Sequence, residues 1–173
     1  VLGIERATLY RKLDRYARHI VLRDIGGPGQ SKLLDSHVLL IGAGGIGCPA
    51  IQYLAAAGVG TISAVDDDDI SLSNLQRQVL FSEAQIGQPK VNAAAQAVAR
   101  LNPDLTFHGI KERITAQTSK QILEDVDVVI DGSDNFATRL IVNDLCLAAR
   151  VPLVSAAIGQ FHGQIGTFTG WEA

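Results

Sequence analysis

An uncharged stretch that glycines divide into three pieces constrains the fold more than any other feature of this sequence. Residues 38–65 contain no Asp, Glu, Lys or Arg. A run of this length is long enough to span a membrane, but several glycines and one proline interrupt it, as turns interrupt strands and helices. The pieces are predicted as a strand at 37–41, a helix at 46–57 and a strand at 61–65. A strand–helix–strand unit explains the run better than a membrane span, so no membrane association is expected.

The rest of the chain continues this alternation of strands and helices. Strands are predicted at 105–110, 126–130 and 153–157, with an edge strand at 163–169, and helices at 90–101, 118–123 and 135–149. A capping box at 73–76 predicts one further short helix. The 173 residues are 47% hydrophobic, which is enough for one buried core. The alternation predicts an α/β fold, a Rossmann-like doubly wound domain with a mainly parallel sheet.

The N-terminal part of the chain differs from the rest in charge. Residues 1–23 hold six basic and two acidic side chains, whereas the whole chain has a net charge of −3. We expect residues 1–30 to form an N-terminal helical segment, with an amphipathic helix at 5–18 and a glycine-rich link at 26–29. Residues 31–173 then form the main domain. The acidic balance of the chain and the absence of a known reader motif argue against nucleic acid as a partner.

A glycine-rich turn follows the first predicted strand. Gly42, Gly44 and Gly47 fit the pattern G-x-G-x-x-G between a strand and a helix, with Gly45 inside it. Such a turn brings backbone N–H groups close to phosphates, and the helix N-terminus adds partial positive charge. Asp66 follows the next strand, where dinucleotide sites place a ribose ligand. The pattern indicates a nucleotide without distinguishing NAD, FAD and ATP, and glycines that serve only tight packing would also fit it.

Further candidates follow from the rule that ligands bind at the carboxyl ends of the strands. Lys90 lies in the first turn of a helix, where a cation is unfavourable unless it holds a phosphate, and an exposed lysine is the alternative. Arg77 is a second cation near this edge, and both are expected at the rim of a cleft. Asp134 could hold magnesium against phosphate oxygens or cap a helix. Asp68 is expected to be a polar or metal-linked neighbour of Asp66. Cys48 is expected to be a small buried residue.

Seven short motifs occur in order along the chain. They occupy residues 15–19, 42–49, 55–60, 66–69, 71–78, 87–90 and 133–139. The sequences Asn-Leu-Gln-Arg-Gln at 74–78 and Pro-Lys at 89–90 are the most specific, because a chance glycine pattern would not bring them with it. Together the motifs closely resemble the ThiF/MoeB/HesA family, bacterial relatives of ubiquitin-activating enzymes. The resemblance runs from about Arg15 to the last residue.

The resemblance implies an activity. Family members bind ATP and magnesium and adenylate the C-terminal Gly-Gly carboxylate of a ubiquitin-fold sulfur-carrier protein, releasing pyrophosphate, in molybdopterin, thiamine or related sulfur-transfer biosynthesis. In the family, the position of Asp66 binds ribose, that of Asp134 lies at the metal, and that of Arg18 is reached from the other subunit of a homodimer. The implied catalytic residues are Arg18, Arg77, Lys90 and Asp134. The implied nucleotide-binding residues are Gly42, Gly44, Gly45, Gly47, Asp66, Asp68, Ser73, Asn74, Leu75, Gln76, Arg77, Lys90, Asp134 and Asn135.

Two expectations complete this interpretation. Many relatives carry Cys-x-x-Cys pairs for structural zinc, whereas this sequence holds only Cys48 and Cys146, so zinc is expected only from residues outside an ATP-binding adenylation core at 31–173. The few cysteines and the lack of a signal peptide favour the cytoplasm.

Two alternative functions stay open. The first is an NAD(P)-dependent oxidoreductase, which gives Arg77 and Lys90 no role. The second is a non-catalytic nucleotide-binding module that docks a partner.

Overall fold

One six-stranded sheet organises the molecule. A computed structural model describes residues 11–12, 14–118 and 120–171. The strands are β1 (His37–Ile41), β2 (Thr61–Val65), β3 (Thr106–Ile110), β4 (Val128–Asp131), β5 (Leu153–Ile158) and β6 (Gly163–Phe168). They lie in the order β3-β2-β1-β4-β5-β6, with every pair parallel except the pair that β5 makes with β6. This is the strand order of doubly wound nucleotide-binding sheets, and the predicted fold class is confirmed.

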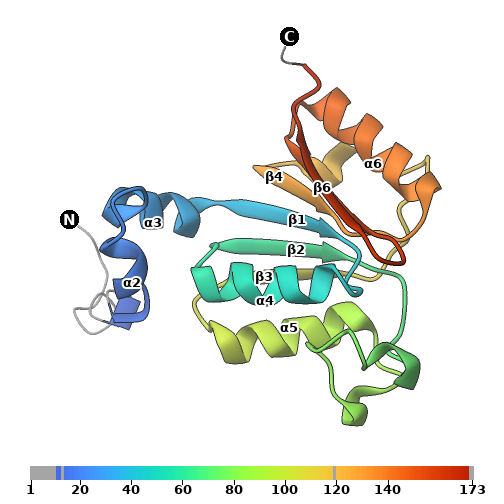
Figure 1. Cartoon of the computed structure of the whole chain (residues 1–173), viewed down its shortest axis with the longest axis horizontal. Helices are drawn as coiled ribbons and strands as arrows, with labels where there is room; N and C mark the ends of the chain where they lie inside the picture. The colour runs from blue at the N-terminus through green and yellow to red at the C-terminus, as the bar shows by residue number, and fades with distance from the viewer. Residues whose placement is uncertain (1–10, 13, 119, 172–173) are drawn as a thin grey trace.

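Helices cover both faces of the sheet (Figure 1). The α-helices are α2 (Ala17–Ile20), α3 (Gly26–Asp35), α4 (Gly47–Ala57), α5 (Lys90–Leu101) and α6 (Phe136–Ala149), and the 3-10 helices are η1 (Leu72–Asn74), η2 (Glu83–Gln85) and η3 (Lys120–Leu123). Because successive strand residues point to opposite faces, Val38 and Leu40 of β1 join the core that α4 and α5 cover. Leu39 and Ile41 join the second core, which contains residues of α6 and η3.

The uncharged stretch forms the unit β1-α4-β2, so the prediction of a strand–helix–strand unit is confirmed. Both strands have their predicted bounds, and α4 begins one residue later than expected. Gly58 ends α4 in the left-handed conformation, with φ 90°, which glycine adopts without steric cost. No helix among the described residues is long and apolar enough to cross a membrane.

Two predicted boundaries are wrong for identifiable reasons. Residues 26–29 are the first turn of α3 and not a link, and the helical bond from Gly29 N to the Ile25 carbonyl measures 2.8 Å. Pro28 fits there because the first N–H groups of a helix have no partner within it. Strand β4 begins at residue 128 and not at 126, because Asp127 instead accepts the His37 N–H at 2.8 Å with its side chain.

The other predicted elements are present with smaller differences. Helices α5 and α6 and strands β3, β5 and β6 lie within one residue of their predicted bounds. The capping box lies two residues earlier than predicted, because Ser71 and Asn74 form it at the start of η1. Pro89 is the N-cap of α5, which begins at its predicted residue.

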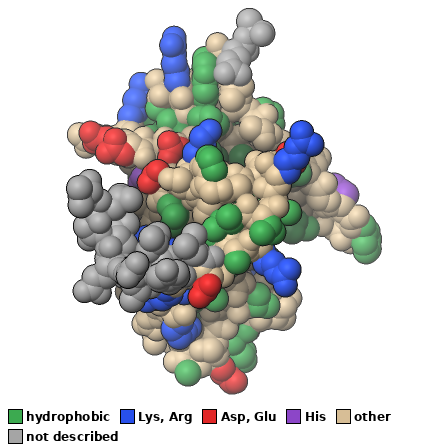
Figure 2. Space-filling model, turned by 90° about the vertical axis from the view of Figure 1, so that its left-hand side faces the viewer, with side chains coloured by type: hydrophobic (Ala, Val, Ile, Leu, Met, Phe, Trp, Pro, Cys, Tyr) green, Lys and Arg blue, Asp and Glu red, His purple; other side chains and the backbone are tan. Residues whose placement is uncertain are grey.

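The N-terminal segment packs at the amino end of the sheet. The predicted helix at 5–18 falls partly on residues outside the described ranges. Of the part described, Tyr16 is buried and its hydroxyl accepts a hydrogen bond from Asn102 Nδ2 at 3.0 Å. Arg15 donates to the carbonyl of Leu101, the last residue of α5, at 2.8 Å. Figure 2 views the molecule from this end, and the visible Lys and Arg side chains are scattered over this face.

Candidate functional site

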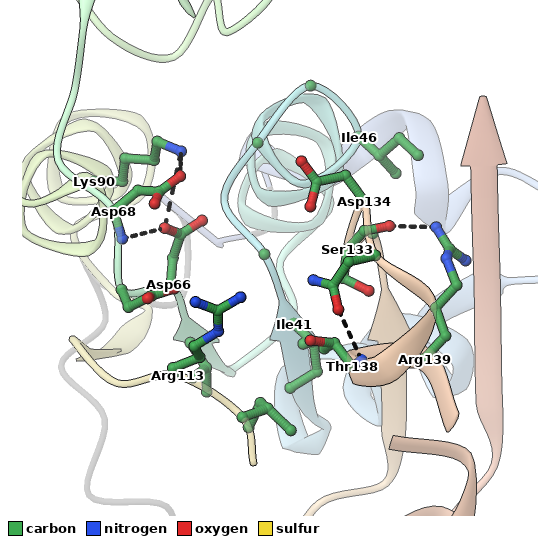
Figure 3. Close-up of a pocket in the computed structure, with 18 of the residues that line it drawn as sticks. Ile41, Ile46, Asp66, Asp68, Lys90, Arg113, Ser133, Asp134, Thr138 and Arg139 are labelled. Carbon is green, nitrogen blue, oxygen red and sulfur yellow. Dashed lines mark hydrogen bonds and ion pairs between the residues drawn. The ribbon is translucent and has the colours of Figure 1, made fainter. Parts of the chain in front are cut away.

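A cleft of about 830 Å³ opens at the carboxyl ends of the strands (Figure 3). The loops that follow β1, β2, β3 and β4 all contribute to its wall. The candidate residues that line it are Gly42, Gly44, Gly45, Asp66, Asp68, Asn74, Arg77, Lys90, Asp134 and Asn135. The glycine turn and the segments 66–68 and 132–135 thus meet at one edge of the sheet.

The glycine turn leaves several backbone donors free. Gly42 has φ 90°, and its N–H binds the carbonyl of Val65 at 2.8 Å. Within the described part of the chain, no acceptor binds the N–H groups of Gly44, Gly45 or Ile46. Free N–H groups beside a helix N-terminus form a ready site for an anion such as phosphate.

Gly47 has a different role from the other glycines of the turn. It does not line the cleft. A β-carbon at Gly47 would lie 1.9 Å from the Gly42 carbonyl oxygen, so only glycine permits this close approach of helix and turn. Packing, rather than contact with a ligand, therefore explains Gly47.

Asp66 ties the end of β2 to the glycine turn. Its carboxylate accepts the N–H of Ala43 at 2.7 Å and the N–H of Asp68 at 2.8 Å. Burial raises the pKa of Asp66 above its ordinary value, while the Asp68 N–H and the Lys90 ammonium offset part of that increase. An ionised carboxylate has about four acceptor positions, so this one can still accept bonds from ribose hydroxyls.

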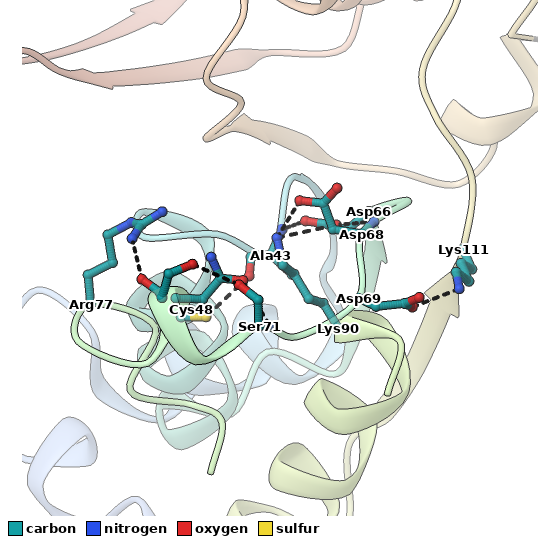
Figure 4. A network of polar contacts seen from close by, with 11 residues as sticks. Ala43, Cys48, Asp66, Asp68, Asp69, Ser71, Arg77, Lys90 and Lys111 are labelled. Atoms are coloured by element: carbon teal, nitrogen blue, oxygen red, sulfur yellow. Dashed lines mark hydrogen bonds and ion pairs between the residues drawn. The ribbon is translucent and has the colours of Figure 1, made fainter. Parts of the chain in front are cut away.

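Lys90 is a buried cation held by two carboxylates (Figure 4). Its Nζ lies 2.6 Å from Asp68 Oδ2 and 3.9 Å from Asp66 Oδ1, and its side chain is only 5% exposed. The alternative of an exposed lysine is therefore wrong, and so is the expectation that Lys90 lies at the rim. The sequence contained an indication of this ion pairing, because the acidic run 66–69 follows the strand adjacent to the helix that carries Lys90.

Two arginines reach the cleft from loops. Arg77 is exposed, donates to the Ser73 carbonyl at 3.2 Å, and lies against Gly45, where a β-carbon would come within 3.4 Å of its Cδ. Arg113 lies near Asp66 in Figure 3 and has no ion-pair partner among the described residues. Sequence reasoning missed Arg113, although it follows β3 and the rule of the strand carboxyl ends would have found it.

A buried ion pair shapes the loop that presents Asp134. Asp131, 1% exposed, lies 3.4 Å from Arg139 Nη1, and its other oxygen accepts the Ser133 N–H at 2.9 Å. Arg139 also donates to the Ser133 carbonyl. The N-cap of α6 is Asn135, whose Oδ1 accepts the Thr138 N–H at 2.9 Å, so Asp134 does not cap the helix. Asp134 is exposed in the cleft and can serve a ligand.

Carboxylates at two places in the cleft could bind magnesium, the cluster at 66–68 and Asp134. The carboxylate oxygens of Asp66, Asp67 and Asp68 approach one another within 4.8 Å, but two of these three carboxylates, Asp66 and Asp68, are already ion-paired with Lys90. Asp134 is therefore the better candidate, because Mg²⁺ is commonly held by one or two carboxylates together with substrate phosphates.

Five of the candidate residues do not line the cleft. They are Arg18, Gly47, Ser73, Leu75 and Gln76. Arg18 is exposed on α2, at the opposite end of the sheet from the cleft. Cys48 is fully buried, and burial raises the pKa of its thiol to about 12, which confirms the expectation of a small buried residue.

Comparisons with known proteins identify the family of this chain. A model of the ThiF family matches residues 16–173. The SAMP-activating enzyme E1 of Haloferax volcanii is 47% identical over 156 residues, which cover 90% of this chain and 58% of that protein. The sulfur carrier protein ThiS adenylyltransferase of Escherichia coli is 47% identical over 163 residues (94% and 65%), and the molybdopterin-synthase adenylyltransferase of the same organism is 46% identical over 159 residues (92% and 64%).

The chain thus spans 58–65% of the length of these three relatives. A crystal structure of PaaA in its selenomethionine form matches with a TM-score of 0.81 and 23% identity, covering 96% of this chain and 54% of that chain. At that identity, the likeness concerns the fold alone.

Proposed function

Because this chain belongs to the ThiF family, we propose that its cleft binds ATP and adenylates the C-terminal glycine carboxylate of a small ubiquitin-fold sulfur-carrier protein, releasing pyrophosphate. The reaction would serve molybdopterin, thiamine or related sulfur-transfer biosynthesis in the cytoplasm. The names of the relatives, which include adenylyltransferases of ThiS and of molybdopterin synthase, support this proposal.

The observation that carries the proposal is the gathering of positive groups around the glycine turn. Lys90, Arg77 and Arg113 line one cleft together with the free N–H groups of the turn. A dinucleotide needs donors for a pyrophosphate only. Two or more cations beside a glycine turn suit the larger charge of a triphosphate better, and an oxidoreductase would give Lys90 and Arg77 no role.

The proposed chemistry needs no nucleophile from the protein. The carboxylate of the carrier attacks the α-phosphorus, a new P–O bond forms there, and the bond to pyrophosphate breaks with its electron pair. Negative charge grows on the phosphoryl oxygens during this step. Cations already fixed in place stabilise that charge without reorganisation, so Lys90 and Arg77 act by electrostatic stabilisation and by orienting the phosphates. Cys48, with its raised pKa and full burial, takes no part.

Asp134 would hold the magnesium ion. When bound, the ion neutralises charge on the phosphate oxygens. The Asp131–Arg139 pair holds the backbone of the loop in which Asp134 lies, through bonds to the N–H and carbonyl of Ser133. Asp66 would bind the ribose hydroxyls with the acceptor positions that its two backbone bonds leave free.

Arg18 can act only from a second copy of the chain. It lies at the amino end of the sheet, whereas the cleft is at the carboxyl end. We therefore propose a two-fold homodimer in which each Arg18 completes the partner's cleft. Mixing Arg18→Ala with Lys90→Met protein tests this, because mixed dimers should regain one intact site that neither variant has alone. No recovery after subunit exchange would refute the arrangement.

Pyrophosphate exchange tests the proposed function directly. The protein is incubated with ATP, Mg²⁺ and a carrier that ends in Gly-Gly, and incorporation of labelled pyrophosphate into ATP is measured. Exchange that depends on the carrier's last glycine supports adenylation. Binding of NAD without exchange would instead support an oxidoreductase, and ATP binding without exchange a non-catalytic docking module.

A further inference from the structure

The short helix α2 is held in place by the residues around it and not by an apolar face of its own. None of its four residues is buried, and a helix of this length is not stable in water by itself. Tyr16, the residue before it, is 3% exposed. Its ring fills the space beside Gly58, where a β-carbon would lie 2.5 Å from the ring. Tyr16 therefore attaches the start of α2 to the body of the molecule.

The buried side chain of Asn102 connects Tyr16 to the end of α4. Asn102 is 1% exposed, and its Nδ2 donates to the Tyr16 hydroxyl and to the Ala55 carbonyl, both at 3.0 Å. Its Oδ1 accepts the N–H of Asp104 at 3.3 Å. Both polar atoms of this buried amide thus have partners, and one of the bonds goes to the residue that begins α2.

Gln30 connects a second point of α2 to the same end of α4. It is the only buried residue of α3. Its Nε2 donates to the Ala57 carbonyl at 3.0 Å, and its Oε1 accepts from Nδ1 of His19, inside α2, at 2.7 Å. The last carbonyls of a helix lack partners within it, and the bond to Ala57 alone would satisfy this need. The bond to His19 therefore requires a separate explanation.

Arg18 lies between these two attachment points. It is exposed, and its side chain forms no hydrogen bond or ion pair with any residue that the structure describes. Helix α2 lies at the end of the sheet opposite the cleft (Figure 1), so the attachments do not hold Arg18 for the cleft of its own subunit. They are suited to hold an unpaired cation in one place on the surface, where a second copy of the chain can meet it.

We propose that Tyr16 and Gln30 are positioning residues, which hold α2 so that Arg18 of one copy reaches the nucleotide in the cleft of its partner. This inference rests on the proposed function and on the homodimer proposed with it. A displacement of about 1 Å at a reacting group can cost 10²-fold in rate, so the guanidinium must be fixed before the reaction. The exposed residues of α2 cannot fix it, and the bonds from Asn102 and Gln30 do.

A double variant, Tyr16→Phe with Gln30→Met, removes both connections and keeps most of the packed volume. The aromatic ring at residue 16 still covers Gly58. We expect carrier-dependent pyrophosphate exchange to fall by about 10- to 100-fold, and by no more than Arg18→Ala lowers it. Adding the two substitutions to Arg18→Ala should lower the rate no further, because the side chain that they position is already absent.

Mixed dimers supply a readout that a merely structural role would not change. The double variant is mixed with an excess of Lys90→Met protein, which has lost its own site and keeps a well-placed Arg18. In these dimers the intact cleft of the double variant receives Arg18 from the partner subunit. Exchange per subunit of the double variant should therefore return to about the parental rate, whereas a defect inside its own cleft or fold would persist.

The matched control is Tyr53→Phe with Gln85→Met. Tyr53 is 77% exposed, and Gln85 is buried with Ser82 and Gln96 as partners, none of them a residue of α2. The control removes the same chemical groups, one hydroxyl and one buried amide. It should keep the parental rate of exchange.

Parental exchange in the folded double variant would overturn the inference, and so would a loss of rate that persists in the mixed dimers. Parental exchange in Arg18→Ala would overturn it together with the proposed homodimer arrangement, while adenylation itself stands. A parent protein without carrier-dependent exchange would instead refute the proposed function.

Discussion

Replacing Lys90 with methionine separates the structural role of its ammonium from its proposed catalytic role. Methionine keeps an unbranched side chain in the same space and removes the charge. In the structure, that charge lies between Asp68 and Asp66 and beside the site proposed for phosphate. We therefore expect both stability and activity to fall.

The loss of stability follows from the exposure of the two carboxylates. The Asp68 side chain is 65% exposed, so water replaces the lysine at a cost of at most about 1 kcal/mol. The Asp66 side chain is only 9% exposed. Removing one partner of a buried ion pair costs about 3–5 kcal/mol. Asp66 would lose less, because it keeps two backbone N–H bonds and lies 3.9 Å from the ammonium. We therefore expect the loss of its pairing with Lys90 to cost about 1–2 kcal/mol. The sum of about 1–3 kcal/mol lowers the unfolding temperature by roughly 2–12 °C.

The loss of activity should be larger. Removal of one preorganised electrostatic donor costs roughly 10²–10³ in rate. Calorimetry measures the unfolding temperature, and carrier-dependent pyrophosphate exchange measures the rate at a temperature where both proteins are folded. Arg77→Met is the matched control, because its exposed guanidinium should lose a similar factor in rate with a stability change within about 0.5 kcal/mol. Near-parental exchange in folded Lys90→Met protein would refute the proposed role, and an unchanged unfolding temperature would refute the reasoning on its ion pairs.

Three further outcomes are expected. Gly47→Ala should destabilise the fold by about 1–3 kcal/mol in urea denaturation, because the turn has no space for a β-carbon. A β-carbon at Gly27 would meet nothing within 4 Å, so Gly27→Ala should not destabilise the fold in this way. Equal effects of the two substitutions would contradict the packing argument. Cys48 and Cys146, with pKa values raised by burial to about 12 and about 11, should react with a thiol reagent at pH 8 only after unfolding, and one fast equivalent in the native protein would disprove this. Because burial raises the pKa of Asp66, the folded protein keeps the Asp66 proton at pH values where the unfolded chain has lost it. The free energy of unfolding should therefore fall as pH rises from the ordinary pKa to the raised one. Asp66→Asn should flatten that part of the pH curve, and an unchanged slope in the variant would contradict this assignment.

Most strands and helices were predictable because the residue patterns that specify them lie within the segments themselves. Strands 37–41 and 61–65 and helix 90–101 have the bounds that apolar periodicity and the punctuation by glycine and proline predict. One of the two boundaries that failed depends on a distant partner. Strand β4 starts late because Asp127 binds the N–H of His37, a residue 90 positions away in the sequence.

The same distinction applies to the site. Sequence alone determined which segments meet, because the strands of a doubly wound sheet end at one edge and carry the glycine turn, Asp66 and Asp134 with them. Only the tertiary structure decided that Lys90 is buried against Asp68, and that Tyr16 and Gln30 hold α2 at the opposite end of the sheet. Burial and pairing depend on distances between residues of different loops. The crossovers and the strand register set those distances, and no local pattern of residues encodes them.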